Sequence, residues 1–279
     1  MVKHTYVAPL RISLVTTHQF LQAIAESLQD THKQTFVTTP NSEFLYAALT
    51  DDHAEQLLNK ADIAIADGVG IFWVERFLSI PFYFHSKALR WCEAFVQMVI
   101  SGARVLLTPQ YLYQNIPEKI TGSNVIYDLA QVAALHKKSL YLLGNWGDSA
   151  QKTAELLQRL NPGLQIAGFS NKTADDASVI PDIQKAQPDL LMVGFGPIKQ
   201  EQWIVDHLPE LPVRVAIGVG GSFDYASGNK IVPPKWIRDI GLEWLFRLVT
   251  QFRFRRVYRA VIGLITETIK YKIKHSTHV

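Results

Sequence analysis

The chain has 279 residues, of which 48% are hydrophobic and 19% are charged, and it contains a single cysteine, Cys92. This composition excludes a disordered or collagen-like chain, and one cysteine excludes a disulfide framework and a cysteine-rich metal site. The net charge of +3 is unevenly spread, because residues 247–279 hold eight Lys and Arg residues against one acid and the rest of the chain holds 20 against 24. We therefore expect a mildly acidic globular body that carries a basic tail.

Short apolar runs alternate with amphipathic stretches along most of the chain. The predicted strands are Ile12–Val15, Thr35–Thr38, Ile63–Ala66, Val105–Leu107, Leu140–Leu143, Gln165–Phe169, Leu190–Val193 and Val213–Ile217. The predicted helices cover residues 18–29, 42–59, 122–136, 148–160 and 199–207. This alternation predicts βαβ units, and hence an α/β fold with a mostly parallel sheet that is flanked by helices.

Two segments depart from this alternation. Residues 71–120 contain one apolar helix, and their sequence assigns them no function. From Pro233 onward, the pattern predicts a basic amphipathic helical appendage, so that residues 1–232 form the catalytic body and residues 233–279 form the appendage. No secretory signal is recognisable in residues 1–30, so we expect the protein to stay on the side of the membrane where it is made.

Several predicted strands end in polar or glycine-rich turns, and the turn with Asp67 and Gly68 carries a carboxylate. Because ligands of open parallel sheets bind beyond the carboxyl ends of the strands, these turns are expected to line one crevice. Asp67 suits either a general base or a helix cap, and Asn41 suits either a sugar contact or a helix cap. The turn before Gln200 and Glu201 suits either a phosphate site or an ordinary strand-to-helix corner.

Other familiar chemistries are missing from the sequence. The nine His residues show no HExxH spacing, no DxD pair occurs, and no GxSxG motif is found. The run from Gly194 has Lys199 at the third glycine position of a dinucleotide fingerprint, which argues against a nicotinamide-dependent oxidoreductase. We therefore expect neither a metal nor a cofactor.

Taken together, the motifs resemble the WecG/TagA/CpsF glycosyltransferases, glycosyltransferase family 26. The segments that carry the resemblance occur in order over roughly residues 10–255: TTPNSEFL (38–45), ADIAIADGVG (61–70), TGSNVIYDLA (121–130), LYLLGNWGDS (140–149), DLLMVGFGPIKQEQWI (189–204), IGVGGSFDYASG (217–228) and GLEWLFRL (241–248). The resemblance implies a Rossmann-like sheet and an inverting, metal-independent transfer. The sugar, of the N-acetylmannosamine type, its uronic acid or glucose, would pass from a UDP donor to a polyprenyl-diphosphate-linked sugar at the inner face of the bacterial membrane.

The resemblance also assigns roles to residues. Asp67 matches the catalytic base of the family, Thr39 and Asn41 match its Thr/Asn turn, and Gln200 matches the glutamine of its GxxKQE motif. Arg247, Arg253, Arg255 and Arg256 are the plausible counterparts of arginines that bind the acceptor diphosphate and the membrane. We assign contacts with the nucleotide sugar to the strand-end turns, at Gly68, Gly144, Asn145, Gly194, Gly196, Lys199, Glu201, Gly218, Gly220, Gly221 and Asp224.

The sequence differs from the family pattern at four places. Pro197 and Ile198 shift the usual proline by one position, Asn124 replaces an Asp, Val232–Pro234 replaces Arg-Ala-Pro, and about 35 residues around 75–115 are inserted.

The resemblance implies a cytoplasmic protein that lies peripherally on the inner face of the membrane. We expect it to bind no nucleic acid, and we leave open whether it forms a homo-oligomer. The alternative is a catalytically inactive relative, or a non-enzymatic protein that binds membranes or nucleic acids through its basic tail.

Overall fold

A computed structural model describes residues 2–144, 147–234, 237, 245–246, 249 and 258–275. Its centre is a six-stranded, wholly parallel sheet with the strand order β4-β3-β8-β7-β5-β6, and β1 and β2 form a separate antiparallel pair. The strands are β1 (His4–Val7), β2 (Leu10–Ser13), β3 (Thr35–Thr38), β4 (Ile63–Ala64), β5 (Ser139–Gly144), β6 (Gln165–Ser170), β7 (Leu190–Gly194) and β8 (Val215–Gly218). The α/β class with a parallel sheet is thus confirmed.

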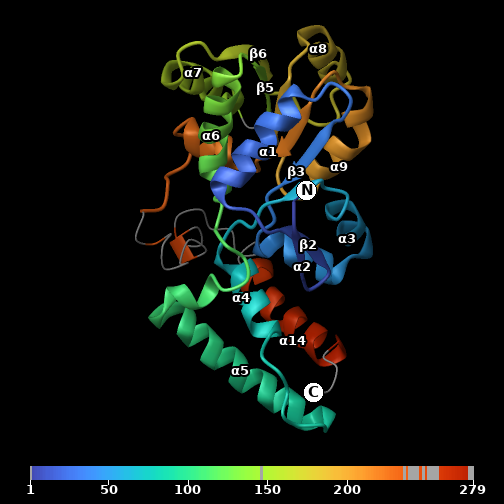
Figure 1. Ribbon diagram of the computed structural model, residues 1–279, viewed down its shortest axis with the longest axis vertical. Coiled ribbons are helices and arrows are strands. Elements are labelled where there is room, and N and C mark those ends of the chain that lie inside the picture. Colours follow the sequence, from blue (N-terminus) through green and yellow to red (C-terminus); the bar gives the residue numbers. More distant parts are fainter. Residues whose placement is uncertain are drawn as a thin grey trace.

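Helices cover both faces of the sheet and extend beyond its carboxyl edge (Figure 1). They are α1 (Thr17–Gln29), α2 (Ser42–Thr50), α3 (Asp52–Leu58), α4 (Val69–Leu78), α5 (Lys87–Leu107), α6 (Gly122–Leu135), α7 (Ser149–Leu160), α8 (Val179–Ala186), α9 (Lys199–His207), α10 (Ser222–Ala226) and α14 (Leu264–His275). Short helical turns are η1 (Pro109–Leu112), η2 (Leu208–Glu210) and the π-helical η3 (Arg259–Gly263). None of the described helices is long and apolar enough to cross a membrane.

The buried strands divide their side chains between two layers of helices. Leu140 and Leu142 of β5 pack with the apolar faces of α1, α6 and α7, whereas Tyr141 and Leu143 pack with α8 and α9. Successive strand residues point to opposite faces, so a strand that is covered on both sides is apolar throughout. This is why the continuous apolar runs of the sequence predicted the central strands well.

Three predicted elements are wrong in detail. The predicted strand Ile12–Val15 overlaps β2, which pairs with β1 across a turn where Ala8 adopts a φ of 52°, and so does not join the parallel sheet. The predicted strand Val105–Leu107 is the last turn of α5, because its apolar run continues a helical repeat. The single helix predicted for 42–59 is divided at Asp51, whose side chain accepts a hydrogen bond from the His53 backbone N–H at 2.9 Å and so caps α3.

A second apolar cluster lies at the carboxyl edge of the sheet and joins β1, β2 and α2 to a helical lobe. We define the helical lobe as residues 69–112 together with residues 264–275, that is, α4, α5, η1 and α14. In this lobe α14 packs against α5 and α4 and also against α2 of the body (Figure 1). The division of the chain into residues 1–232 and 233–279 stays a prediction, but the last described helix packs on this cluster.

Candidate active site

The motif-bearing turns lie side by side because their strands are neighbours in the sheet. β4, β3, β8, β7 and β5 are consecutive and parallel, so the turns that follow them meet at one edge. The chain leaves β3 toward β4 on one side, and it leaves β5 toward β6 on the other. Such a reversal of direction opens a crevice at the carboxyl ends of the strands, where ligands of this fold class bind.

Asp67 follows β4, the outermost strand on one side of the sheet, and is partly exposed. Its backbone N–H donates to Pro40 O at 2.8 Å, which ties the end of β4 to the turn after β3. A Cβ placed on Gly122, the first residue of α6, would lie 3.1 Å from Asp67 Oδ2. The carboxylate therefore rests against the start of α6, and a residue larger than glycine at position 122 would press on it.

Thr39 and Asn41 follow β3, beside Asp67. Thr39 is buried, and its hydroxyl donates to Gly218 O at 3.2 Å, which connects the β3 turn to the end of β8. Asn41 Oδ1 accepts hydrogen bonds from the backbone N–H groups of Glu43 at 2.9 Å and Phe44 at 3.4 Å. Asn41 therefore caps α2, as one of its two sequence-based interpretations predicted, while its role toward a sugar stays a prediction.

Gln200 and Glu201 are buried beneath the β8 turn. Gln200 Oε1 accepts the Gly220 backbone N–H at 2.9 Å, and Gln200 Nε2 donates to Glu201 Oε1 at 2.6 Å. Glu201 Oε2 in turn accepts the Ile198 backbone N–H at 2.7 Å. The amide of Gln200 thus holds the glycine turn in place, a contact that the family motif did not reveal.

Burial raises the pKa of Glu201 to about 8, although the hydrogen bonds from Gln200 and from the Ile198 backbone work in the opposite direction. Ile198 itself has a φ of 68°, which is strained for a β-branched residue, and it lies at the corner where the sequence departs from the family pattern.

The glycines of the strand-end turns serve two different purposes. A Cβ on Gly144 or Gly194 would lie 3.0 Å or 2.9 Å from the ring of Phe223, so these two make room for the packing of α10. Gly68, Gly196 and Gly220 have positive φ, and a Cβ there would meet none of the described atoms within 4 Å. The open corners where a ligand can approach the backbone are therefore Gly68, Gly196 and Gly220. Gly218 is not open, because a Cβ there would clash with the side chains of Glu201 and Gln200, and a Cβ on Gly221 would lie 3.8 Å from Asp224 Oδ2.

Two charged residues assigned to the nucleotide sugar are engaged elsewhere. Asp224 is buried, accepts a hydrogen bond from Ser149 Oγ at 3.0 Å and forms an ion pair with Lys230. Lys199 is exposed and pairs with Asp175 at 3.3 Å. Both therefore stabilise the surroundings of the turns, and their contact with a ligand stays a prediction. Asn145 and the four arginines Arg247, Arg253, Arg255 and Arg256 lie outside the described residues.

The sequence reasoning missed Gly122 and Ser222 as parts of the site. The Ser222 hydroxyl lies 3.1 Å from Gly122 O and 2.6 Å from Val219 O, so it links the start of α6 to the β8 turn. Both residues occur in segments that carried the family resemblance, but neither has a side chain typical of catalysis. Only the folded arrangement shows that α6 begins against the carboxylate of Asp67.

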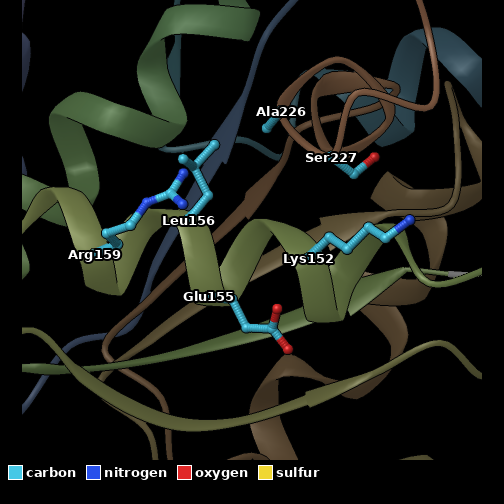
Figure 2. A pocket seen from close by; sticks show the side chains of 6 residues that line it. All are labelled: Lys152, Glu155, Leu156, Arg159, Ala226 and Ser227. Atoms are coloured by element: carbon cyan, nitrogen blue, oxygen red, sulfur yellow. The ribbon is translucent and has the colours of Figure 1, made fainter.

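A surface hollow of about 340 Å³ lies between α7 and the end of α10. Figure 2 shows the side chains that line it, Lys152, Glu155, Leu156, Arg159, Ala226 and Ser227. None of these is among the residues assigned to the site from the sequence. Within the described ranges, no group of three or more His, Cys, Asp or Glu side chains is arranged to hold a metal ion.

A partly exposed carboxylate among open glycine corners, at the carboxyl edge of a parallel sheet, is typical of an α/β enzyme that acts on a ligand with a phosphate group. The chain matches the model of the glycosyl transferase WecG/TagA/CpsF family over residues 5–101 and 83–278. The protein therefore belongs to this family and is a glycosyltransferase. The two matches overlap at residues 83–101, which include most of α5, in the region where the sequence suggested an insertion.

Curated relatives agree with this assignment. A protein of Bacillus spizizenii is 26% identical over 91% of this chain and 86% of its own length, and one of Bacillus subtilis is 26% identical over 79% and 74%. A third, from Staphylococcus aureus, is 24% identical over 78% and 73%. Each is named N-acetylglucosaminyldiphosphoundecaprenol N-acetyl-beta-D-mannosaminyltransferase.

Proposed function

We propose that the protein moves an N-acetylmannosamine-type sugar from a UDP donor to a polyprenyl-diphosphate-linked sugar, with inversion and without a metal, in the synthesis of a bacterial cell-surface polysaccharide. The observation that carries the proposal is the position of Asp67. Its carboxylate lies against the start of α6, next to Thr39 and the β8 turn, at the edge where a nucleotide sugar would reach the open glycine corners. The names of the relatives support the sugar and the acceptor.

The proposed reaction is a direct displacement. Asp67 takes the proton of an acceptor hydroxyl while the acceptor oxygen forms a bond to C1 of the donor sugar. The bond between C1 and the phosphate oxygen breaks, and its electron pair leaves with UDP. General-base assistance of this kind is worth about 10²–10⁴-fold in rate. The backbone N–H at the Gly196 corner is the candidate to stabilise the charge that develops on the leaving group, because that of Gly220 is engaged by Gln200 Oε1.

The proposal includes a peripheral position on the inner face of the cytoplasmic membrane, where the acceptor lipid resides. Arg247, Arg253, Arg255 and Arg256 would bind the acceptor diphosphate or the anionic leaflet, to which each Lys or Arg contributes about 1 kcal/mol. The support for this step is the basic charge of residues 247–279 and the lipid-linked acceptor in the names of the relatives.

The decisive experiment measures UDP release with a lipid-linked N-acetylglucosamine diphosphate acceptor. UDP-N-acetylmannosamine, its uronic acid and UDP-glucose are compared as donors. Asp67→Asn should lower kcat by about 10²–10⁴-fold and keep the thermal stabilisation by the donor. Asp52→Asn, on the exposed first turn of α3, is the matched control and should behave as wild type. Wild-type turnover in Asp67→Asn refutes the base, and no UDP release with any donor favours the inactive relative.

A further inference from the structure

Helix α5 turns its polar side chains toward the protein. Gln97 donates to Pro81 O at 2.9 Å and accepts from Lys272 Nζ at 2.5 Å, and Ser101 Oγ accepts from Trp73 Nε1 at 3.0 Å. Glu93 accepts the backbone N–H groups of Tyr83 at 2.9 Å and Phe84 at 3.2 Å. The usual arrangement of a surface helix is therefore reversed, because the groups that normally face water are engaged inside the lobe.

Most of the large apolar side chains of α5 point outward, whereas Ala94, Met98 and Val105 pack into the lobe. Phe95 is 59% exposed and Leu107 is 80% exposed. The exposed large apolar residues of α5 are Leu89, Trp91, Phe95, Val96, Val99, Ile100 and Leu107. At about 3.6 residues per turn they occupy one half of the helix circumference, and the four charged residues Lys87, Arg90, Glu93 and Arg104 fall outside that half. We call this half the outer face of α5; it extends for about 31 Å.

An exposed apolar face of this length, bordered by polar residues, indicates a surface that contacts another protein or a membrane. We propose that the outer face of α5 docks on the surface of an anionic lipid bilayer, with the helix lying in the plane of the membrane. The role of this segment was not apparent from the sequence. The inference rests on the proposed function, because a lipid-linked acceptor requires the enzyme to work at a membrane.

The charges that border the outer face identify the occupant. Two cations, Lys87 and Arg104, border the outer face, whereas Arg90 lies on the opposite side of the helix, where its Nε donates to Phe84 O at 3.0 Å. Both oxygens of Glu93, which also borders the face, accept backbone N–H groups. A basic rim with an apolar face that contains Trp and Phe is the pattern of helices that bind anionic membrane surfaces.

The site and the outer face belong to one packed unit. Asp67 immediately precedes Gly68, which caps α4, and the ten-residue α4 is about 15 Å long. α4 packs against α5 (Figure 1). The hydrogen bond from Trp73 Nε1 to Ser101 Oγ joins the two helices. A bilayer under α5 would therefore hold the catalytic corner at a fixed, short height above the headgroups, where a diphosphate-linked sugar is presented.

The single cysteine of the chain provides a direct probe, because Cys92 is exposed and lies on the outer face. An environment-sensitive fluorophore on Cys92 should shift its emission to the blue on vesicles of phosphatidylglycerol and phosphatidylcholine, and spin-labelled acyl chains should quench it. Vesicles of phosphatidylcholine alone should give a weaker signal. If the protein sediments with anionic vesicles while the emission of the label stays unchanged, α5 is not the contact and the proposal is overturned.

A double variant tests the face itself. Phe95→Gln with Val99→Gln should weaken partitioning into anionic vesicles at least tenfold. The control is Leu135→Gln with Leu160→Gln, two exposed apolar residues of the α/β body, which should bind as wild type. A Phe95/Val99 variant that binds vesicles as wild type, or that only converts a dimer to a monomer in sedimentation velocity, overturns the proposal in favour of a second copy or no partner.

A further measurement separates this inference from the proposed function. With a short-chain, water-soluble acceptor, the Phe95/Val99 variant should release UDP at the wild-type rate, because the outer face holds no part of the site. If the wild type releases no UDP but the Cys92 label still enters the bilayer, the proposed function fails and the docking surface stands. If UDP release is normal and the label stays in water, the proposed function stands and the docking surface is refuted.

Discussion

Replacing Gln200 with Leu distinguishes a positioning role from contact with substrate. Leu has nearly the volume of Gln, so Gln200→Leu leaves little cavity but removes both hydrogen bonds of the amide. The Gly220 N–H loses its acceptor and Glu201 Oε1 loses its donor. A buried polar group without a partner costs about 1–3 kcal/mol, so the loss of two partners should lower the free energy of unfolding by about 2–6 kcal/mol.

Urea denaturation followed by tryptophan fluorescence measures this loss, with kcat/KM determined on the same samples. The control is Gln151→Leu, because Gln151 is exposed on α7 and bonds only within its own helix, to Glu155 at 3.0 Å. The control should change stability by less than about 0.5 kcal/mol. If Gln200→Leu unfolds at the wild-type urea concentration yet loses activity, Gln200 acts on the substrate and the positioning role is refuted.

Three further predictions concern the site and the lobe. Because the folded pKa of Glu201 is raised to about 8 from 4.5, the folded state retains a proton that the unfolded state releases, and stability should fall as pH rises from about 4.5 to 8. Glu201→Gln should flatten that decline in urea midpoints measured across pH, and an unchanged slope would contradict the assignment. Burial lowers the pKa of Lys272 to about 8 from 10.5, so stability should rise with pH between about 8 and 10.5, and Lys272→Met should abolish this rise. Gly122→Val should lower kcat at least tenfold and keep the fold by circular dichroism, because its side chain would press on Asp67 Oδ2; full activity would show that the carboxylate works elsewhere.

The sequence predicted the sheet because its strands are covered on both faces. Runs such as Leu190–Gly194 are apolar throughout, and such short runs between helical patterns predict parallel strands. The same rule failed at Val105–Leu107, where an equally short apolar run belongs to a helix. A run of three residues is too short to distinguish the periodicity of a helix from that of a strand. Only the apolar repeat of the preceding turns identifies α5 as a helix.

Asp67 could be proposed as a site residue from the sequence, because a carboxylate after a strand has a chemical meaning by itself; its catalytic role stays a prediction. The use of Gln200 could not be predicted, because an amide in a motif suits a sugar, a phosphate or a backbone N–H equally well. Its actual partner, the Gly220 N–H, is 20 residues away in the chain and is placed by the pairing of β7 with β8. Contacts that depend on strand order lie beyond what the spacing of one sequence can determine.

The basic tail shows a related limit. Lys272 counted toward the positive charge that was expected to face a membrane, yet it is buried, and that expectation is wrong for this residue. Its ammonium donates to Phe77 O at 2.7 Å and to Gln97 Oε1, and it lies 4.3 Å from the centre of the Phe77 ring. Net charge does not show which cations remain exposed to water, because two buried hydrogen-bond acceptors are enough to hold one cation inside the protein.

The position of α14 determines how the membrane question must be tested. Leu264 begins α14, and its side chain would lie 3.6 Å from a Cβ on Gly70, three residues after Asp67. Ending the chain at Val232 would therefore remove the support of α4 and leave Gln97 without its cationic partner, in addition to removing the basic tail. Loss of vesicle binding or of turnover in such a truncated chain would not distinguish a lost membrane contact from a disordered catalytic corner. Substitutions on the outer face of α5 leave this packing intact, and they can therefore separate the two.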